Sequence, residues 1–208
     1  MMVERYSKRY NEMGYNVRTL GWGDTEQQEY RFVQTYATEL NGKHVLDIGC
    51  GFGDYYKTML KNDIAPAQYT GWDINPDLVG EANKIFAEDS KANFAVSDLT
   101  TLSLDAPVAD VGIMLGLLNL NLDGHEYNNM EYSKMMIRNA FAAVKETLVV
   151  DFISTAREGD WPEEDFIFYH NPAEMLEFAL ELSPNAMIRH NYLPIPQKEF
   201  MLFITKPA

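Results

Sequence analysis

The chain has 208 residues, of which 46% are hydrophobic, so it is long enough to bury a sizeable core and favours a single globular domain. Its 31 acidic residues against 17 Lys and Arg give a net charge of −14, which argues against a nucleic-acid partner because a phosphate backbone would be repelled. No apolar run approaches a membrane span, the first residues do not read as a signal peptide, and the one cysteine, Cys50, excludes an internal disulfide and a cysteine-rich metal site. We therefore expect a cytoplasmic protein with no membrane partner and no metal, and the oligomeric state stays open.

Two helices are predicted before the first strand, over residues 2–12 and 25–40. In the second helix, Thr25 and Gln28 have the spacing of a capping box. Its apolar side chains fall on one helical face: Phe32, Val33, Tyr36 and Leu40.

The stretch Val45–Asp54 is the most informative part of the sequence. An apolar run with the character of a buried strand carries one acid, Asp47, and then breaks into a glycine-rich turn: Gly49, Gly51 and Gly53. Glycine is required where the backbone turns with positive φ or where a ligand lies against the main chain. A helix predicted over 54–62 would point its free N–H groups back at this turn. The pattern indicates a strand that ends in a ligand-binding loop.

The next predicted strand, 68–73, ends in an acid, Asp73, 20 residues beyond Gly53. In a doubly wound sheet this position lies beside the glycine loop, where a carboxylate accepts hydrogen bonds from both hydroxyls of a ribose. Pro76 then starts a predicted helix over 76–88.

Two further strands end at the same edge of the predicted sheet. The strand at 93–97 is followed by Asp98 and Leu99, which we expect to bind an adenine amino group and to flank its ring. The strand at 110–115 ends in Leu115 and opens into a glycine. Ligands bind at this edge in doubly wound sheets. The remaining predicted elements are a helix at 127–144, a strand at 147–152, a loop to about 171, a helix at 172–182 and closing strands at 186–192 and 198–205.

The glycine loop, the ribose acid and the adenine-side acid resemble, in order and spacing, those of the class I S-adenosylmethionine-dependent methyltransferases, from about residue 43 to the C-terminus. The resemblance implies an α/β fold: a doubly wound, mostly parallel seven-stranded sheet in order 3-2-1-4-5-7-6, with strand 7 antiparallel and helices on both faces. It implies one domain over 1–208, with residues 1–42 as a helical lid or cap on a core of 43–208. It also implies S-adenosylmethionine as cofactor and in-line transfer of its methyl group to a small-molecule acceptor. The cofactor-binding residues predicted in this way are Asp47, Gly49, Cys50, Gly51, Gly53, Asp73, Ile74, Asp98, Leu99, Leu115, Trp22 and Arg9.

Two other functions are compatible with a glycine loop followed by a ribose acid. A nicotinamide-dependent oxidoreductase also has a glycine loop and a ribose acid. Here, however, Asp54 occupies the position of the third glycine of the Gly-x-Gly-x-x-Gly motif, and its charge is unfavourable beside a pyrophosphate. The chain also lacks a Tyr-x-x-x-Lys pair of the short-chain dehydrogenase kind. The other alternative is a cofactor-binding regulatory or partner protein without transferase activity.

The segment before the first strand is expected to form the lid. Trp22 lies between two glycines and, with Tyr6 and Tyr10, would close an aromatic wall over the methionine end of the cofactor, with the two tyrosines also touching substrate. Arg9 or Arg18 would pair with the cofactor carboxylate. The alternative is that these aromatic side chains simply attach the extra helices to the core.

The acceptor is less visible in the sequence, because the cofactor already carries an activated methyl group. The Asn/Asp-Pro-Pro-aromatic turn of nucleobase methyltransferases is missing after the fourth strand, where Asn119 is either a substrate contact or a residue that shapes the turn. His125 and His170, in loops predicted to open on the ligand edge, are the candidate general bases. Cys50 is better explained as a small packing residue than as a nucleophile.

Overall fold

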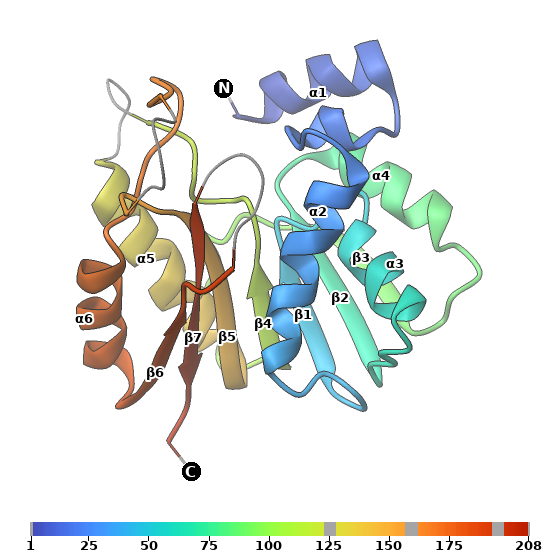
Figure 1. The fold of residues 1–208 in the computed structure, drawn as a ribbon. Helices are drawn as coiled ribbons and strands as arrows, with labels where there is room; N and C mark the ends of the chain where they lie inside the picture. Colours follow the sequence, from blue (N-terminus) through green and yellow to red (C-terminus); the bar gives the residue numbers. More distant parts are fainter. Residues whose placement is uncertain (1, 123–127, 157–161, 193–197, 208) are drawn as a thin grey trace. The chain divides into compact units, whose positions relative to one another are not determined.

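The structure is a computed structural model that describes residues 2–122, 128–156, 162–192 and 198–207 (Figure 1). The chain divides into two compact units, Met1–Leu102 and Ser103–Ala208. The single-domain organisation, with a lid over 1–42, remains a prediction.

The predicted sheet is confirmed. Seven strands lie in the order β3-β2-β1-β4-β5-β7-β6, with helices around the sheet. β7 runs antiparallel to β5 and β6, whereas β1 with β2, β2 with β3, and β4 with β5 are parallel pairs. The strands are β1 His44–Ile48, β2 Gln68–Asp73, β3 Ala92–Val96, β4 Ala109–Met114, β5 Val144–Ile153, β6 Asn185–Arg189 and β7 Glu199–Thr205.

The helices of the first unit follow the prediction closely, with one difference. They are α1 Met2–Met13, α2 Thr25–Phe32, α3 Asp54–Lys61 and α4 Pro76–Ile85, with short 3₁₀ helices η1 Val17–Leu20 and η2 Val33–Ala37. The helix predicted over 25–40 is therefore α-helical only to Phe32. There the Thr35 hydroxyl donates to the Phe32 carbonyl oxygen at 2.7 Å, a side-chain bond of the kind that competes with regular helical bonding.

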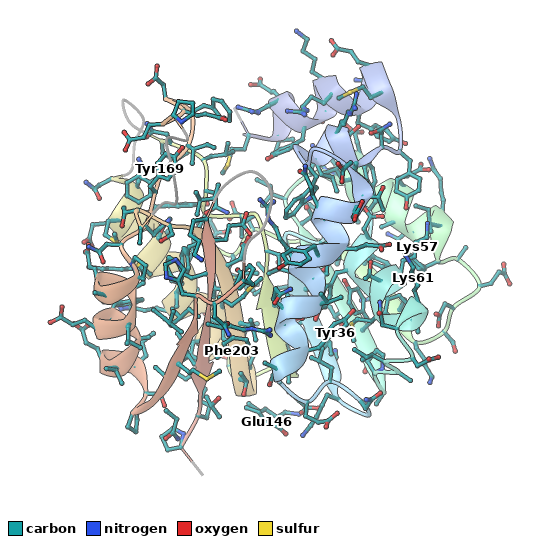
Figure 2. All side chains as sticks on the ribbon, viewed as in Figure 1. Tyr36, Lys57, Lys61, Glu146, Tyr169 and Phe203 are labelled. Atoms are coloured by element: carbon teal, nitrogen blue, oxygen red, sulfur yellow. The ribbon has the colours of Figure 1, made fainter. Side chains whose placement is uncertain are left out.

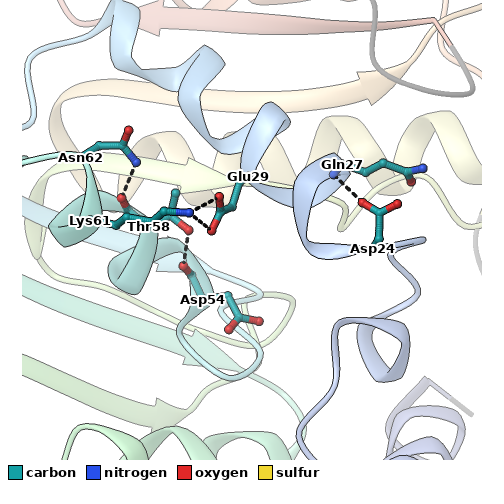
Figure 3. Close-up of polar contacts among 7 residues, drawn as sticks. All are labelled: Asp24, Gln27, Glu29, Asp54, Thr58, Lys61 and Asn62. Carbon is teal, nitrogen blue, oxygen red and sulfur yellow. Dashed lines mark hydrogen bonds and ion pairs between the residues drawn. The ribbon is translucent and has the colours of Figure 1, made fainter.

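The capping box predicted at the start of α2 is wrong. The N-cap is Asp24, whose carboxylate accepts from the backbone N–H of Gln27 at 2.8 Å (Figure 3). Asp is as good an N-cap as Thr, and the extended backbone of Asp24 places its side chain over the first turn.

Polar contacts join α2 to α3. The ammonium of Lys61 on α3 lies 2.7 Å from a carboxylate oxygen of Glu29 on α2 (Figure 3). A second bond lies within α3, where the Thr58 hydroxyl donates to the Asp54 carbonyl oxygen. Figure 2 shows Lys61 and Lys57 projecting from α3 one helical turn apart. Such exposed pairs stabilise only weakly, so the apolar faces of the two helices hold most of this contact.

An aromatic cluster forms the core between β2, β3, α3 and α4. The ring centroid of Tyr56 lies 4.5 Å from that of Tyr69 and 5.3 Å from that of Phe86, and Phe86 stacks on Phe94 at 5.3 Å. Aromatic rings bury large areas and favour such tilted and offset contacts. This cluster lies beneath the glycine loop.

The second unit contains α5 Asn129–Ala142 and α6 Pro172–Leu182, the latter with the predicted bounds. β5 is longer than the predicted 147–152, and β6 ends at Arg189 instead of residue 192. Phe152 stacks on Phe200 at 5.0 Å across the antiparallel pair of β5 and β7, and Phe203, marked in Figure 2, lies opposite Val149 in the same ladder. Of the helices in the described residues, none is long and apolar enough to cross a membrane.

Candidate functional site

The glycine loop bends sharply at the carboxyl end of β1. Gly49, Gly51 and Gly53 have φ values of 80°, 52° and 80°, a region that residues with a Cβ rarely adopt. The N–H groups of Gly49 and Cys50 donate to the Trp72 carbonyl oxygen at 2.7 and 3.1 Å, which ties the loop to β2. The predicted turn with positive φ is present at all three glycines.

Packing explains two of these glycines as well as backbone conformation does. A Cβ on Gly51 would lie 2.9 Å from Cδ1 of Leu20, and a Cβ on Gly53 would lie 2.7 Å from Phe86 and 2.8 Å from Phe94. Gly53 is therefore required because a Cβ does not fit against the aromatic cluster, and this reason does not depend on a ligand. Its contact with the cofactor remains a prediction.

Asp73 lies against this loop, as predicted for the ribose acid. Ile48 pairs with Trp72, so Asp73 follows directly beside the turn. One carboxylate oxygen of Asp73 accepts from the N–H of Gly51 at 3.0 Å, and the other accepts from the N–H of Asn75 at 2.8 Å. Burial raises the pKa of Asp73. Each oxygen has a second lone pair, so both retain capacity for a ribose hydroxyl.

The adenine-side turn lies next to Asp73. The N–H of Ser97 donates to the Asp73 carbonyl oxygen at 2.9 Å, which brings the end of β3 beside the end of β2. Asp98 is exposed, and one of its oxygens accepts from the N–H of Thr100 at 2.9 Å, while Leu99 is buried. This bond uses one oxygen of the exposed Asp98 carboxylate, so the other has the capacity to accept from a donor such as an exocyclic amine.

Asp47 and Cys50 are both interior. The Tyr69 hydroxyl donates to the Asp47 carboxylate, and burial raises the pKa of Asp47 to about 7. The buried Cys50 sulfur would lie 2.8 Å from a Cβ on Gly71, and burial also raises the pKa of this thiol. Cys50 fits the packing role, and Asp47 supports the loop from within the sheet, so direct cofactor contact by either side chain stays a prediction.

The N-terminal segment is attached to the loop and to α4 by tyrosines. The Tyr10 hydroxyl donates to Glu81 at 2.8 Å, and its ring centroid lies 5.8 Å from that of Phe52 in the loop. The Tyr15 hydroxyl donates to Asp54 at 2.7 Å, at the first residue of α3. The segment therefore packs beside the predicted cofactor site of the first unit.

Tyr6, Arg9 and Ile74 lie in the same region. Burial raises the pKa of Tyr6, and the charges of Arg9 and Asp73 both act on its hydroxyl, so Tyr6 is within electrostatic range of the ribose acid. The Arg9 guanidinium donates to the carbonyl oxygen of Arg18, and Ile74 is half-buried. The predicted contacts of Tyr6 with substrate and of Arg9 and Ile74 with the cofactor stay predictions.

Trp22 packs on α2. It is 9% exposed, its ring centroid lies 6.0 Å from that of Phe32 in an edge-on contact, and the Arg31 guanidinium carbon lies 4.6 Å from its ring centre. For Trp22, this geometry favours attachment of the segment to the core over the predicted wall above the methionine end.

In the second unit, the turn after β4 is shaped by main-chain contacts. Leu115 is buried, and the next residue, Gly116, has φ 71° and donates its N–H to Asp151 at 2.6 Å. The side-chain oxygen of Asn119 accepts from the N–H of Ile153 at 2.9 Å. Of the two roles considered for Asn119, this contact favours shaping of the turn.

His170 is fully buried, contrary to the expectation that its loop opens on the ligand edge. Its Nε2 lies 2.9 Å from the Ser133 hydroxyl, and its ring centroid lies 4.5 and 4.7 Å from those of Phe152 and Phe168. Burial lowers its pKa to about 3, so it is a weak base at neutral pH. The other candidate, His125, lies outside the described residues.

The sequence interpretation missed Asn75 and Leu20. The sequence interpretation assigns no role to Asn75, whose N–H donates to Asp73; the spacing Asp-x-Asn is the signal that could have found it. Leu20 carries no sequence signal for its position over Gly51. Over the described ranges, no group of three or more His, Cys, Asp or Glu side chains is arranged to hold a metal ion.

Comparison with known proteins gives a family-model match to part of the chain and a set of structures with a similar fold. Residues 45–130 match the family model described as a methyltransferase domain, whereas no curated protein matches the chain. Among solved structures, it is similar to magnesium protoporphyrin IX methyltransferase (ChlM) from Synechocystis PCC 6803 with bound SAH, at 18% identity and a TM-score of 0.67, over 98% of this chain and 94% of that one.

Two further structures have the same fold. The DhpI–SAH complex is 15% identical with a TM-score of 0.68, covering 99% of this chain and 96% of that chain. The [4+2]-cyclase SpnF is 15% identical with a TM-score of 0.65, covering 86% and 81%. Identities this low show a shared fold and leave substrate and reaction to be argued from the site.

Proposed function

We propose that this chain, which belongs to the class I S-adenosylmethionine-dependent methyltransferases and has S-adenosylmethionine as its cofactor, transfers the methyl group to a small-molecule acceptor. The observation that carries the proposal is the pairing of the Gly51 N–H with the Asp73 carboxylate, which joins a loop of positive φ to a partly exposed acid at the ligand edge. This arrangement suits a ribose lying across the loop.

The charges around the loop suit this cofactor. Asp54 stands at the first turn of α3, held by Tyr15 and by the amide of Gln28 at 3.4 Å, and Asp73 binds the loop at the N–H of Gly51. A positive sulfonium is favoured near carboxylates, whereas a pyrophosphate would be repelled. The acids therefore favour S-adenosylmethionine over a nicotinamide dinucleotide.

The protein's contribution to the reaction is alignment and exclusion of water. When bound, the cofactor supplies an activated methyl group, so in-line transfer needs the acceptor atom, the methyl carbon and the sulfur on one axis. We expect Asp73 to orient the ribose and Asp98 the adenine, and this would fix the direction in which the methyl points. A base is needed only for an acceptor that arrives protonated, and the buried position of His170 argues against that residue.

Charge supports a small acceptor. A net charge of −14 gives no release of counterions on meeting phosphates, which disfavours RNA and DNA. ChlM, one of the similar structures, is named for a porphyrin substrate. We further propose cytoplasmic residence, since the single cysteine forms no internal disulfide.

The test is a transfer assay with methyl-labelled S-adenosylmethionine. We expect label to enter the small-molecule fraction of a cell extract, and to stay out of separated protein and nucleic-acid fractions. Asp73→Ala is the negative control for transfer. Label in the RNA fraction, together with RNA binding at ~0.15 M salt, would overturn the small-molecule proposal.

A second candidate is a cofactor-binding protein that transfers no methyl group. The similarity to SpnF, named as a [4+2]-cyclase, favours keeping it, because the fold alone does not require transfer. Binding of S-adenosylhomocysteine with no label transferred to any fraction would support this candidate.

A further inference from the structure

Asn75 uses both ends of its side chain. Its amide oxygen caps α4, accepting from the N–H groups of Asp77 at 2.9 Å and Leu78 at 3.3 Å. Its amide nitrogen donates to the Val3 carbonyl oxygen at 3.0 Å and to the Ser7 hydroxyl at 3.1 Å, both on α1. The oxygen must face the two main-chain donors, so the network fixes which way the amide points.

The cap alone does not require asparagine. Asp and Ser cap helices about as well as Asn, because only an acceptor oxygen is needed. What Asn adds is the NH₂ group, and in this chain that group contacts α1. Asn75 is itself buried, so these bonds are shielded from water.

The same residue holds the predicted ribose acid. The backbone N–H of Asn75 donates to Asp73 at 2.8 Å, on the carboxylate oxygen opposite the one that binds Gly51. One buried residue therefore contacts the acid, the start of α4 and the N-terminal helix.

α1 depends on such contacts. None of its residues is fully buried, and an isolated helix of 12 residues is marginal in water. Val3, Ser7 and Tyr10 lie on one face at helical spacing, and this face makes the bonds to Asn75 and to Glu81. The helix is thus held by polar bonds at its edge together with partly buried rings such as that of Tyr10 on Phe52, contacts that can open without disrupting the core.

We propose that Asn75 is a positioning residue that couples occupancy of the cofactor site to the docking of α1. The inference rests on the proposed function. Cofactor bound at Asp73 stabilises the position of Asn75, and Asn75 in turn holds α1 beside the site. Because coupling is reciprocal, loosening α1 through Asn75 weakens cofactor binding by the same factor by which cofactor strengthens α1 docking.

The test compares Asn75→Ser with Asn171→Ser. Both change the asparagine of an Asn-Pro helix start to another capping residue, and Asn171 caps α6 through the N–H of Ala173 at 2.9 Å, so any small change in capping is matched. A second variant, Ser7→Ala, removes one acceptor on α1 and leaves the cap and Asp73 untouched. Hydrogen exchange of residues 2–13 is measured with and without S-adenosylhomocysteine, alongside its dissociation constant and dissociation rate.

We expect S-adenosylhomocysteine to slow exchange of α1 in the wild type and in Asn171→Ser, and to have little effect on it in Asn75→Ser. The dissociation constant of Asn75→Ser should rise about fivefold, through faster dissociation, with a smaller rise in Ser7→Ala. Wild-type exchange in α1 that ignores the ligand, or an Asn75→Ser variant that behaves as Asn171→Ser does, would overturn the coupling and leave the proposed function intact. Wild-type protein that fails to bind S-adenosylhomocysteine would instead refute the proposed function, and the coupling with it.

Discussion

Replacing Asp73 with alanine removes an acid whose carboxylate binds the glycine loop. Its carboxylate accepts from the N–H groups of Gly51 and Asn75, so the variant loses both the acceptors proposed for the ribose hydroxyls and the support of the loop. A hydrogen bond to a charged group contributes ~1.5–3 kcal/mol. Since each ~1.4 kcal/mol is a factor of ten, we expect binding of S-adenosylhomocysteine to weaken by about one to two decades.

Calorimetric titration measures this change directly. Asp77→Ala is the matched control, because Asp77 is an exposed acid four residues further along the same segment, and it should bind as the wild type does. Circular dichroism checks that Asp73→Ala is folded. A folded Asp73→Ala variant with wild-type affinity would exclude Asp73 from the cofactor site and refute the reasoning.

The pH dependence gives a second measurement on the same residue. Burial raises the pKa of Asp73, and only the ionised carboxylate accepts from both ribose hydroxyls without losing an oxygen to its own proton. Affinity should therefore begin to fall, as the pH is lowered, above the usual titration range of an aspartate. In Asp73→Asn the affinity should be weaker and independent of pH over that range.

Three other outcomes follow from buried groups. Burial raises the pKa of Asp47 from 3.8 to about 7, so between these pH values the folded state keeps a proton that the unfolded state has lost. As the pH rises from about 4 to 7, the free energy of unfolding of the wild type, measured in urea, should therefore fall relative to that of Asp47→Asn by up to roughly 1.4 kcal/mol per pH unit. Parallel plots of stability against pH for the two proteins would contradict the buried acid. The pKa of His170, lowered to about 3, predicts imidazole signals in NMR that do not titrate around the ordinary value of 6.5, and an inflection there would show that His170 is accessible. Gly71→Ala should destabilise the protein by ~1–3 kcal/mol, because its Cβ would lie 2.5 Å from Phe94, whereas Gly80→Ala in α4, where a Cβ meets nothing within 4 Å, should be neutral or stabilising in thermal unfolding.

Much of the fold was predictable because the strands of a parallel sheet are short apolar runs that end in glycine or acid. β2 and α6 have the predicted bounds, since Asp73 and the Asn171-Pro172 start are sharp local signals. The end of α2 was not predictable, because the change to a 3₁₀ helix depends on Thr35, whose hydroxyl also lies 2.7 Å from that of the distant Tyr55.

The candidate site divides in the same way. The loop and Asp73 were predicted because backbone conformation and charge are properties of local sequence. The burial of His170 was not, because it depends on Phe152 and Phe168, which approach it only in the folded chain. The NH₂ group of Asn75 was missed for a similar reason, since its partners lie about 70 positions earlier in the sequence.

Gly51 and Gly53 belong to one motif but are required for different physical reasons. Gly53 is enclosed by the rigid rings of Phe86 and Phe94, while the nearest atoms to Gly51 are the flexible end of Leu20, half-buried on η1. A mutational scan selected on activity would show both positions as equally intolerant. A parallel scan for protein abundance would separate them: substitutions at Gly53 would vanish from the folded pool, whereas many at Gly51 would accumulate as folded, inactive protein. Within one glycine motif, Gly53 would then be required for folding and Gly51 for activity.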